Sequence, residues 1–540
     1  MRALLVWPKF APSFFSLDGV KNLMGKQAIY SPLGLVTIAA ILPQEWSFKI
    51  VDCSIRPISE SDWDWADIVM VSGMITQRKN QGEIIREAKT RGKSVVVGGP
   101  FATSVPNEPK EAGADFLVLD EGELTIPLFL DALERGETSG VFMADGEKAD
   151  MTQSPIPRFD LLNLNEYLEL GVQFSRGCPF LCEFCDIPVL FGRKPRTKDP
   201  KQVIAELELL IDLGWRSTVM LADDNFIGHK KNALIALEVI REWQIANDYP
   251  LRLSTEATIN MADDPRLMKL MNESGISVVF IGIETPDMDS LENIKKKQNI
   301  RLPLLDRVEK IYGHGFRIIS GLILGFDGEQ PGAGKRIFEF VDEAAIPIVM
   351  VNMLYALPNT PLTNRLESEG RMVLDRPSSS AQLSNFILTR PFEEVIEEYA
   401  DCLLMLYDPK NFISRLRRHC LKMGPITRGK KRKKTKGLFE IKAAAVLFWR
   451  HGIKRTTRWM FWSAFFEILW KNPRAFRRYI SCCGIFEHYY SYSLSLRNGL
   501  LKEFEQLGEN RFDIYYPTKE PEVKAKTNTT VAVNEPILVD

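Results

Sequence analysis

The chain has 540 residues, with 69 Lys or Arg against 70 Asp or Glu, which gives a formal net charge of -1 at pH 7. This length exceeds one ordinary hydrophobic core, and a composition that is 45% hydrophobic and 26% charged is typical of soluble globular domains. The balanced charge excludes a protein that is steered as a whole toward nucleic acid, and no apolar run reaches the roughly 18 residues of a membrane-spanning helix.

The eight cysteines are spread unevenly and form no disulfide framework, which indicates a reducing compartment. The N-terminus, MRALLVWPKF, has only a short apolar run before Pro8 and no small-residue cleavage site. It is therefore interpreted as a first strand and not as a signal peptide. We expect a cytoplasmic protein.

Residues 1–150 alternate between short apolar runs and helical patterns. Five runs rich in β-branched or aromatic residues predict strands, at residues 4–7, 48–51, 68–72, 95–97 and 116–119. Helical spacing lies between them. This alternation predicts a parallel, doubly wound, Rossmann-like sheet, whose ligand lies beyond the C-terminal ends of the strands.

Turn residues at these strand ends are candidates for a binding site. Ser72 and Gly73 follow the third strand, Gly98 and Gly99 follow the fourth, and the acidic run 120–123 follows the fifth. Glycine in such places lets a ligand approach the backbone closely. Simple tight turns are an equally good explanation.

A proline-rich linker at 154–157 leads to the stretch QFSRGCPFLCEFCDIPVLFGRKPRTK at residues 173–198. It carries three thiols, Cys178, Cys182 and Cys185, in a C-x-x-x-C-x-x-C spacing. They follow an apolar run, 172–175, that predicts a strand. The turn and charged residues among the thiols indicate an exposed loop, which argues against three buried structural cysteines.

Three soft ligands at the end of a strand predict a metal centre. A structural zinc site needs four ligands, and no fourth Cys or His occurs between residues 65 and 225. His229 remains a candidate fourth ligand in space. An iron-sulfur cluster on three cysteines instead keeps one iron free for a small molecule. We favour the open cluster because of the loop position and the aromatic Phe184 before the last cysteine.

Residues 155–390 contain a second set of strand and helix pairs. Six strands are predicted, at residues 172–175, 218–222, 251–255, 278–283, 318–324 and 348–354. Six such units predict a partial (β/α)6 barrel of the TIM type, with its polar strand ends on one face. Those ends include Asp223, Glu256 and Glu284, each of which alone is also compatible with a helix cap or a turn.

Helical patterns take over from residue 391 and continue to 517. A basic run at 428–436 precedes two aromatic stretches, 438–449 and 459–470, with Lys and Arg at their borders. Residues 428–470 therefore suit peripheral contact with the inner membrane surface, and they equally suit a helical cap on the barrel. No nucleic-acid recognition motif accompanies the basic run. The tail at 518–540 is predicted to be disordered.

The cysteine loop resembles that of the radical S-adenosylmethionine enzymes, and residues 1–150 resemble the cobalamin-binding domain that precedes it in many of them. With the helical region that follows, nearly the whole chain resembles the cobalamin-dependent radical methylases. Within that family it is most similar to the hopanoid C-2 methylases. The stretches that carry this likeness are CEFCDIPVLFGRKPR (182–196), DDNFIGHKK (223–231) and GIETPD (282–287).

The resemblance implies a [4Fe-4S] cluster on the three cysteines, with S-adenosylmethionine on the fourth iron. It implies that Asp223 supports the methionine amine, and that Glu256 and Glu284 face the ribose and carboxylate. Arg176, just before the first cysteine, is expected to form a salt bridge or to tune the cluster.

The resemblance also implies cobalamin at the strand ends that carry Ser72, Gly73, Gly98 and Gly99. Where cobalamin-dependent mutases have D-x-H-x-x-G, this chain reads Asp52-Cys53-Ser54. We therefore expect cobalamin without a histidine lower ligand.

The implied reaction is a methyl transfer to an unactivated carbon of a hydrophobic small molecule, a polycyclic lipid such as a hopanoid at C-2. S-Adenosylmethionine methylates the cobalamin, and a second molecule gives the radical that removes hydrogen. An electron donor such as flavodoxin or ferredoxin is implied. Two alternatives stay open: the same machinery on a tetrapyrrole or another isoprenoid, by methylation or ring closure, and a noncatalytic cobalamin or iron-sulfur sensor.

Overall fold

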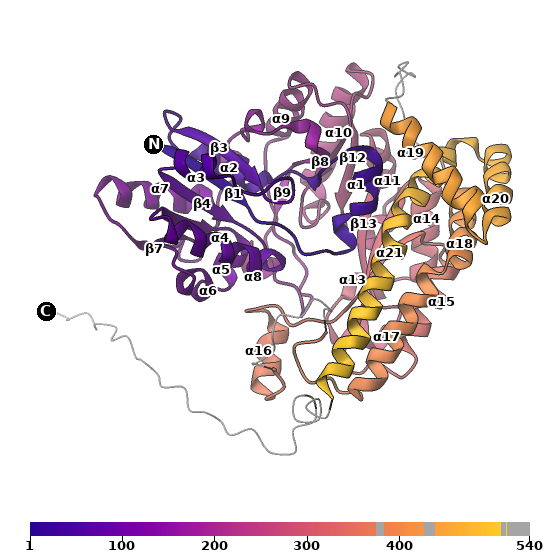
Figure 1. Ribbon diagram of the computed structural model, residues 1–540. Helices are drawn as coiled ribbons and strands as arrows, with labels where there is room; N and C mark the ends of the chain where they lie inside the picture. Colours follow the sequence, from indigo (N-terminus) through magenta and orange to yellow (C-terminus); the bar gives the residue numbers. More distant parts are fainter. Residues whose placement is uncertain (374–382, 426–437, 509–514, 516–540) are drawn as a thin grey trace, which may run out of the picture.

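The computed structural model describes residues 1–373, 383–425, 438–508 and 515. Two parallel sheets lie side by side, each packed against helices, and helices of the C-terminal third cover one end of the second sheet (Figure 1). The predicted α/β fold with a helical C-terminal region is confirmed. The basic run at 428–436 and the tail at 518–540 lie outside the described residues.

The first sheet is the doubly wound sheet predicted near the N-terminus. Its strands are all parallel, in the order β3-β1-β4-β5-β6-β7. Their bounds are β1 (Arg2–Trp7), β3 (Ser47–Asp52), β4 (Ile68–Ser72), β5 (Ser94–Gly98), β6 (Phe116–Val118) and β7 (Gly140–Phe142). The three-residue β7 was not predicted from the sequence.

Helices cover both faces of this sheet. Leu4 and Val6 of β1 enter a hydrophobic cluster with α4 (Arg78–Thr90). Ala3 and Leu5 enter a second cluster with α2 (Leu33–Ile41) and α7 (Gly122–Glu134). Burial on both faces explains why the strands are almost continuous apolar runs.

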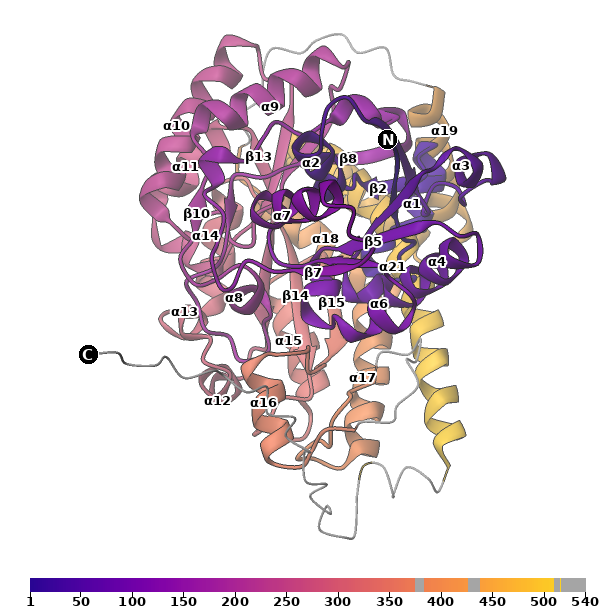
Figure 2. The same cartoon turned by 90° about the vertical axis from the view of Figure 1, so that its left-hand side faces the viewer.

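The second sheet curls into a half-barrel with the strand order β15-β14-β13-β12-β11-β8-β2. Six strands correspond to the predicted ones: β8 (Tyr167–Val172), β11 (Thr218–Leu221), β12 (Arg252–Glu256), β13 (Ile276–Glu284), β14 (Arg317–Leu324) and β15 (Ile348–Met353). The first strand was predicted at residues 172–175, but β8 ends at Val172. Ser175 and Arg176 form a separate strand, β9 (Ser175–Arg176), which pairs with β10 (Arg196–Thr197) and not with the half-barrel. The turned view shows α9 (Pro200–Asp212), α10 (Lys230–Ala246) and α11 (Pro265–Glu273) grouped beside this sheet (Figure 2).

The seventh strand, β2 (Ala28–Tyr30), comes from the N-terminal region. It pairs with β8 through Ala28 and Tyr30. The segment before it also lies on the half-barrel side, since the Phe14 ring is 5.1 Å from that of Tyr489 in the C-terminal region. The domain expected over 1–150 is thus interrupted by residues 14–30, because a three-residue strand gives no signal without the sheet that it joins.

The C-terminal region is helical, as predicted. Its helices are α17 (Phe392–Tyr407), α18 (Pro409–Lys422), α19 (Leu438–Trp449), α20 (Arg458–Lys471) and α21 (Phe476–Leu507). Two tyrosines of α17 attach it to the edge strand β15: Tyr399 Oη donates to the carbonyl of Val351 at 3.0 Å, and Tyr407 Oη to that of Val349 at 2.6 Å. A covered edge strand cannot pair with another chain.

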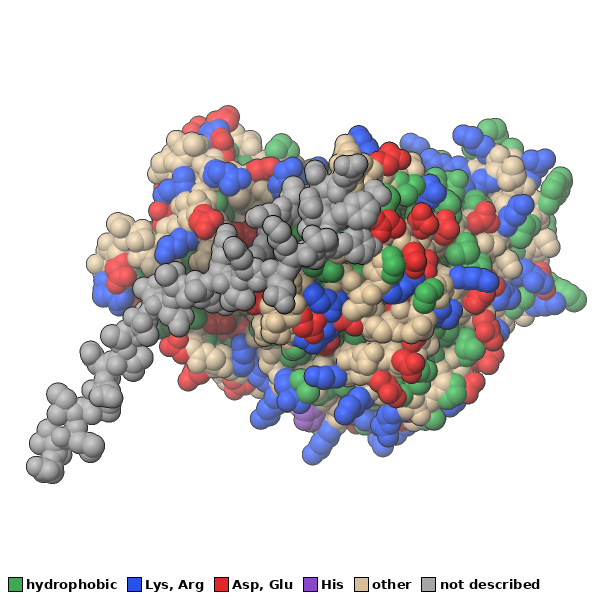
Figure 3. All heavy atoms as spheres, turned by 90° about the horizontal axis from the view of Figure 1, so that it is seen from below, with side chains coloured by type: hydrophobic (Ala, Val, Ile, Leu, Met, Phe, Trp, Pro, Cys, Tyr) green, Lys and Arg blue, Asp and Glu red, His purple; other side chains and the backbone are tan. Residues whose placement is uncertain are grey.

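None of the helices in the described ranges is long and apolar enough to cross a membrane. The surface nevertheless carries hydrophobic side chains among Lys and Arg on the side where α20 lies in Figure 1, as the view from below shows (Figure 3).

Candidate functional site

The three cysteines lie together on the loop between β9 and α8 (Ile187–Leu190), as free and half-buried thiols. Backbone hydrogen bonds hold this loop. Cys178 N donates to Gly192 O at 3.2 Å, and Cys185 N donates to Cys182 O at 3.2 Å. Burial raises the pKa of the Cys178 and Cys185 thiols. A bound metal would favour the thiolates instead, because metal ligation displaces the thiol proton.

The arrangement of ligands discriminates between zinc and a larger cluster. Within the described residues, no three His, Cys, Asp or Glu side chains converge closely enough for a single metal ion. His229 Nδ1 accepts from Asn232 N at 3.2 Å as the cap of α10, so one of its two ring nitrogens is already engaged. Three thiolates spread over one loop fit an iron-sulfur cluster, which is wider than one ion and is held by soft ligands.

Two buried amides point at the thiols. Asn225 Nδ2 lies 3.9 Å from Cys178 Sγ, and Gln298 Nε2 lies 3.7 Å from Cys182 Sγ. Their exposed fractions are 1% and 3%. Such N–H donors stabilise negative charge on ligand sulfur. Gln298 was not predicted, and it lies more than a hundred residues from the cysteine that it contacts.

Asp223 and its neighbour Asp224 brace the start of the cysteine loop. Asp223 accepts from Phe174 N and Ser175 Oγ, both at 2.8 Å. Asp224 Oδ2 accepts from Gly177 N at 2.7 Å. Burial raises the pKa of Asp223 to about 7 and that of Asp224 to about 6. The structure therefore brings the predicted Asp223 to the site and gives it bonds to the loop itself.

Glu256 stands at the end of β12, next to this carboxyl pair. Burial, together with the charges of Asp224 and Asp223, raises the pKa of Glu256 to about 8. Three carboxyl groups at adjacent strand ends favour a cation, since an ammonium or sulfonium group would stabilise their charged forms. This donor set fits the charged end of S-adenosylmethionine.

Glu284, the third predicted carboxylate, is paired. Its Oε1 accepts from Lys296 Nζ, and the two side chains are 9% and 7% exposed. Lys296 Nζ also lies 5.8 Å from the ring of Phe184 in the cysteine loop. Glu284 adopts a positive φ of 67°, which is uncommon for a residue with a side chain and marks a constrained position at the strand end. Lys296 gave no recognisable sequence signal.

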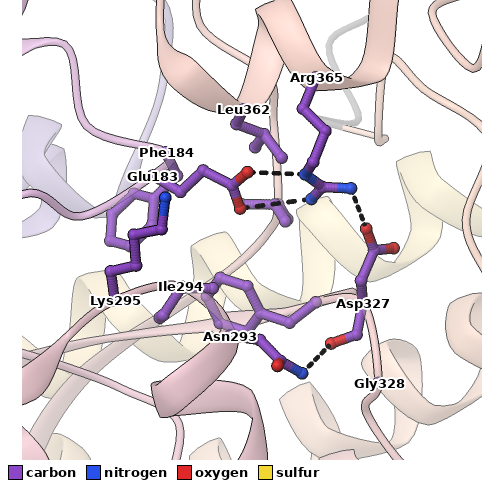
Figure 4. A pocket seen from close by; sticks show the side chains of 11 residues that line it. Glu183, Phe184, Asn293, Ile294, Lys295, Asp327, Gly328, Leu362 and Arg365 are labelled. Atoms are coloured by element: carbon purple, nitrogen blue, oxygen red, sulfur yellow. Dashed lines mark hydrogen bonds and ion pairs between the residues drawn. The ribbon is translucent and has the colours of Figure 1, made fainter. Parts of the chain in front are cut away.

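A cavity of about 420 Å³ opens beside the third cysteine. Its wall carries Phe184 and Phe326, whose ring centroids are 6.0 Å apart. Arg365 crosses its rim, with Nε 2.6 Å from Glu183 Oε1 and Nη1 2.8 Å from Asp327 Oδ2 (Figure 4). An aromatic wall with a polar rim fits the adenosyl part of S-adenosylmethionine.

The predicted turn residues of the first sheet also converge. Ser72 of β4 pairs in register with Gly98 of β5. A Cβ at Gly99 would lie 2.3 Å from Ser72 Oγ, and one at Gly73 would lie 2.6 Å from Gln81 Oε1. Gly99 has a φ of 87°, which glycine adopts without strain. At each of these positions a neighbouring protein atom already fills the space of a Cβ, so the glycine strip of Gly73, Gly98 and Gly99 lets these strand ends pack closely together.

Gln81, which faces Gly73, is fully buried, and neither atom of its amide has a hydrogen-bond partner among the described residues. An unpaired buried amide is unfavourable, and a ligand with amide groups would satisfy it. Cobalamin carries such groups at its periphery, so the unpaired Gln81 amide fits it. No histidine precedes His229 in the sequence, so none in this domain could ligate cobalt.

An ionic network joins the start of α7 to the β9-β10 pair that leads into the cysteine loop. Arg176, two residues before Cys178, lies 2.8 Å from Glu123 Oε1 and 3.0 Å from Glu121 Oε2. Arg196 Nη1 lies 2.8 Å from the same Glu121 oxygen. The expectation of a salt bridge for Arg176 is confirmed, and both of its partners belong to the acidic run that follows the fifth strand of the first sheet.

Three family models match the chain in succession. Residues 27–130 match the B12 binding domain, residues 172–341 match the radical SAM superfamily, and residues 360–501 match a domain of unknown function. The first two matches cover the glycine strip and the cysteine loop.

Similar proteins extend over nearly the whole chain. An uncharacterized methyltransferase of Synechocystis sp. is 49% identical over 99% of this chain and 98% of its own length. The hopanoid C-2 methylase of Rhodopseudomonas palustris is 36% identical over 85% of this chain and 88% of its own length. Among solved structures, the cobalamin-dependent S-adenosylmethionine radical enzyme OxsB shares the fold, with a TM-score of 0.58 at 15% identity over 96% of this chain and 84% of that one.

Proposed function

The chain belongs to the cobalamin-dependent radical S-adenosylmethionine methyltransferases, and we propose that it methylates an unactivated carbon of a hydrophobic polycyclic lipid, a hopanoid at C-2. This family membership makes the protein an enzyme with a [4Fe-4S] cluster, S-adenosylmethionine and cobalamin as cofactors. The alternative of a noncatalytic sensor is therefore set aside.

The cofactors, when bound, supply an electron, a radical source and a transferable methyl group, which an unactivated carbon without a lone pair requires. In our proposal, Cys178, Cys182 and Cys185 hold the cluster. Asp223 and Asp224 keep the start of that loop in place through its backbone N–H groups. Glu256 faces the positive end of S-adenosylmethionine, and Ser72, Gly73, Gly98 and Gly99 cradle cobalamin.

A different role is proposed for Glu284. Because it is paired with Lys296, we propose that it acts through that lysine: Glu284 orients the Lys296 ammonium group toward the cysteine loop, where a carboxylate of S-adenosylmethionine would meet it. Because Lys296 pairs with Glu284, neither group is left as an unpaired buried charge at the end of β13.

The single observation that carries the choice of substrate is the apolar inner wall of the half-barrel. Along β14, buried residues alternate with half-buried ones, and the half-buried set faces away from the covering helices. It begins with Arg317 at the start of the strand and continues with Ile319, Gly321 and Ile323, and β13 adds Val278 and Phe280 with the same half-buried character. Beyond Arg317, toward the C-terminal ends of the strands, none of these residues carries a charge, so this part of the wall suits a hydrocarbon ring system.

Gly321 keeps this wall flat. A Cβ there would lie 3.2 Å from Phe280 Cζ, a tight contact that would bring the wall inward. A flat, apolar wall accepts fused rings better than a branched polar substrate. The relative from Rhodopseudomonas palustris is a hopanoid C-2 methylase, which supports the same class of substrate.

The proposed activity needs an external reductant, and we infer a small electron carrier such as flavodoxin or ferredoxin. We also infer a reducing, cytoplasmic environment, because all eight cysteines are free thiols.

Expression in a hopanoid-producing bacterium that lacks its own C-2 methylase tests the proposal. We expect 2-methylhopanoids to appear in the lipid extract with the wild-type chain, and not with Cys182→Ala. Unchanged hopanoids together with altered pigments would indicate a tetrapyrrole substrate, and unchanged hopanoids with another altered isoprenoid would indicate that isoprenoid. The mass of the product would then distinguish methylation from ring closure.

A further inference from the structure

Large exposed hydrophobic side chains gather on the outer face of α20 and at the end of α19, among the residues that the structure describes. The four most exposed large hydrophobic side chains are Trp470 at 81%, Trp459 at 73%, Phe466 at 61% and Trp449 at 58%. All four lie between residues 449 and 470. Exposed apolar patches of this kind mark an interaction site, because removing apolar surface from water is favourable.

The helix has two distinct faces. Trp459, Phe466 and Trp470 follow one another at intervals of seven and four residues, which places them on one side of an α-helix. Phe461, Ala464 and Ile468 are fully buried on the opposite side, in the main hydrophobic core. The buried side attaches α20 to α18 and α21. The expected role as a helical cap therefore explains the buried face of α20, but it does not explain why the aromatic face is exposed to solvent.

The residues around this face are strongly basic. Residues 441–486 contain nine Lys or Arg and one acidic residue, Glu467, in a chain whose net charge is -1. Glu467 is already paired with Arg417 and Lys471. The outward Arg458 guanidinium lies 5.9 Å from the ring of Trp459, and Arg474 and Arg477 are also exposed. Hydrophobic and basic side chains stand side by side on this part of the surface (Figure 3).

We propose that this face docks on an anionic lipid surface, with Trp459, Phe466 and Trp470 in the interfacial layer and the basic residues against the headgroups. Indole rings prefer the boundary between headgroups and acyl chains, and Lys and Arg beside them gain from negative lipid charge. A second copy of the chain fits less well, because two such faces would bring like charges together. Docking concerns how the protein meets a membrane and does not depend on which carbon is methylated.

Co-sedimentation of the full, anaerobically purified chain with vesicles tests the docking. We expect binding to vesicles of phosphatidylcholine mixed with phosphatidylglycerol, and weaker binding to phosphatidylcholine alone. The triple variant W459S/F466S/W470S should bind the mixed vesicles at least roughly 10-fold more weakly. R474E/R477E should lose the preference for the anionic lipid.

The matched control is L128S/L213S/I245S, which removes three exposed apolar side chains elsewhere and should bind as the wild type does. Circular dichroism confirms that each variant is folded. Wild-type protein that stays in the supernatant with both vesicles would overturn the proposal, as would unchanged binding of the tryptophan variant. A concentration-dependent dimer that W459S/F466S/W470S abolishes would assign the face to a second copy instead. Failure to methylate hopanoids would leave these results unaffected.

Discussion

Arg176 of β9 and Glu123 of α7 form a two-pronged ion pair: Nη2 lies 2.8 Å from Oε1, and Nη1 lies 2.9 Å from Oε2. Both side chains are largely buried, at 12% and 10% exposure. Burial alone would raise the pKa of Glu123, but Arg176 lowers it to about 2. Because Arg176 precedes the cysteine loop and Glu123 opens α7, the pair sets the position of the cluster loop against the cobalamin-binding sheet.

Replacing Arg176 by Lys tests this relationship. A lysine keeps the charge and loses the planar double contact, so we expect the free energy of unfolding to fall by about 2 kcal/mol. The loop should also shift relative to the first sheet. We therefore expect less methylated product for each 5'-deoxyadenosine released, measured together by mass spectrometry.

Arg158→Lys is the matched control, since Arg158 and Asp160 form a similar double contact with exposed fractions of 32% and 46%. Arg158→Lys should change the free energy of unfolding by less than about 1 kcal/mol, and it should leave the ratio of methylated product to 5'-deoxyadenosine unchanged. An unchanged ratio in Arg176→Lys would remove the positioning role from this pair.

Gln298 offers a second test, on the iron-sulfur cluster itself. If Cys182 holds the cluster as proposed, the Gln298 amide N–H toward it would stabilise negative charge on the sulfur, and therefore the reduced form of the cluster. Gln298→Leu should lower the midpoint potential by an amount on the order of tens of millivolts. A redox titration followed by electron paramagnetic resonance measures it.

Gln330→Leu, which changes an exposed glutamine, should leave the potential at its wild-type value. Asn225→Leu should shift it in the same direction as Gln298→Leu, since Asn225 faces Cys178 in the same way. If Gln298→Leu matches the wild type, the amide does not tune the cluster.

The sequence predicted the parts of this site that are marked locally. The cysteine loop, the polar ends of β11 and β12 and the glycines after β4 and β5 each follow an apolar run, so a single stretch of chain shows both the strand and its end. Asp223 was expected at the site for this reason. Its bonds to Phe174 and Ser175 could not be foreseen, because they depend on how β8 and β11 pair.

Residues that reach the site from distant segments were missed. Lys296 caps the four-residue helix α13 (Lys297–Ile300) and Gln298 lies in it, and so short a helix shows no recognisable pattern in the sequence. Gln81 of α4 carries no mark in the sequence, although its amide is buried against Gly73. Such contacts appear only when the chain is folded, since nothing in the local composition distinguishes them.

Removing one cluster ligand should abolish the iron-sulfur centre. Cys182→Ala leaves two thiols on the loop, so we expect the reconstituted protein to lose its iron and its visible absorption, and to release no 5'-deoxyadenosine. The control Cys53→Ser changes another half-buried free cysteine, and this variant should keep its iron, its visible absorption and its release of 5'-deoxyadenosine. Full iron content in Cys182→Ala would mean that the cluster has other ligands.

The inner wall of the half-barrel can be tested at Gly321. Gly321→Val introduces two methyl groups toward Phe280, so it should reduce room for a ring system and weaken binding of the lipid substrate. Release of 5'-deoxyadenosine without substrate should persist, because the cluster loop is untouched. Gly34→Val, at a glycine with open space around it, is the control. Equal methylation by Gly321→Val and the wild type would exclude this wall from substrate binding.

Asp52 makes the stability of the first sheet depend on pH. It ends β3 and is 5% exposed, with Oδ1 accepting from Ser54 N at 2.8 Å. Burial raises its pKa from 3.8 to about 6. Between these two values the folded chain holds a proton that the unfolded chain releases, so its contribution is fully present below about pH 4 and is lost as the pH rises through about 6.

Asp52→Asn keeps an acceptor for Ser54 and cannot ionise, so it should become the more stable protein as the pH rises. We expect similar unfolding midpoints for both chains near pH 4, and a difference that grows to as much as about 3 kcal/mol above pH 7. Chemical unfolding of the apoprotein at several pH values, followed by circular dichroism, measures this difference. Asp64→Asn changes an exposed carboxyl on the neighbouring helix, so its free energy of unfolding should change with pH as that of the wild type does. If the free energy of unfolding of Asp52→Asn also changed with pH as that of the wild type does, Asp52 would already be ionised in the folded protein at low pH. Its burial at the end of β3 would then add no pH dependence to stability.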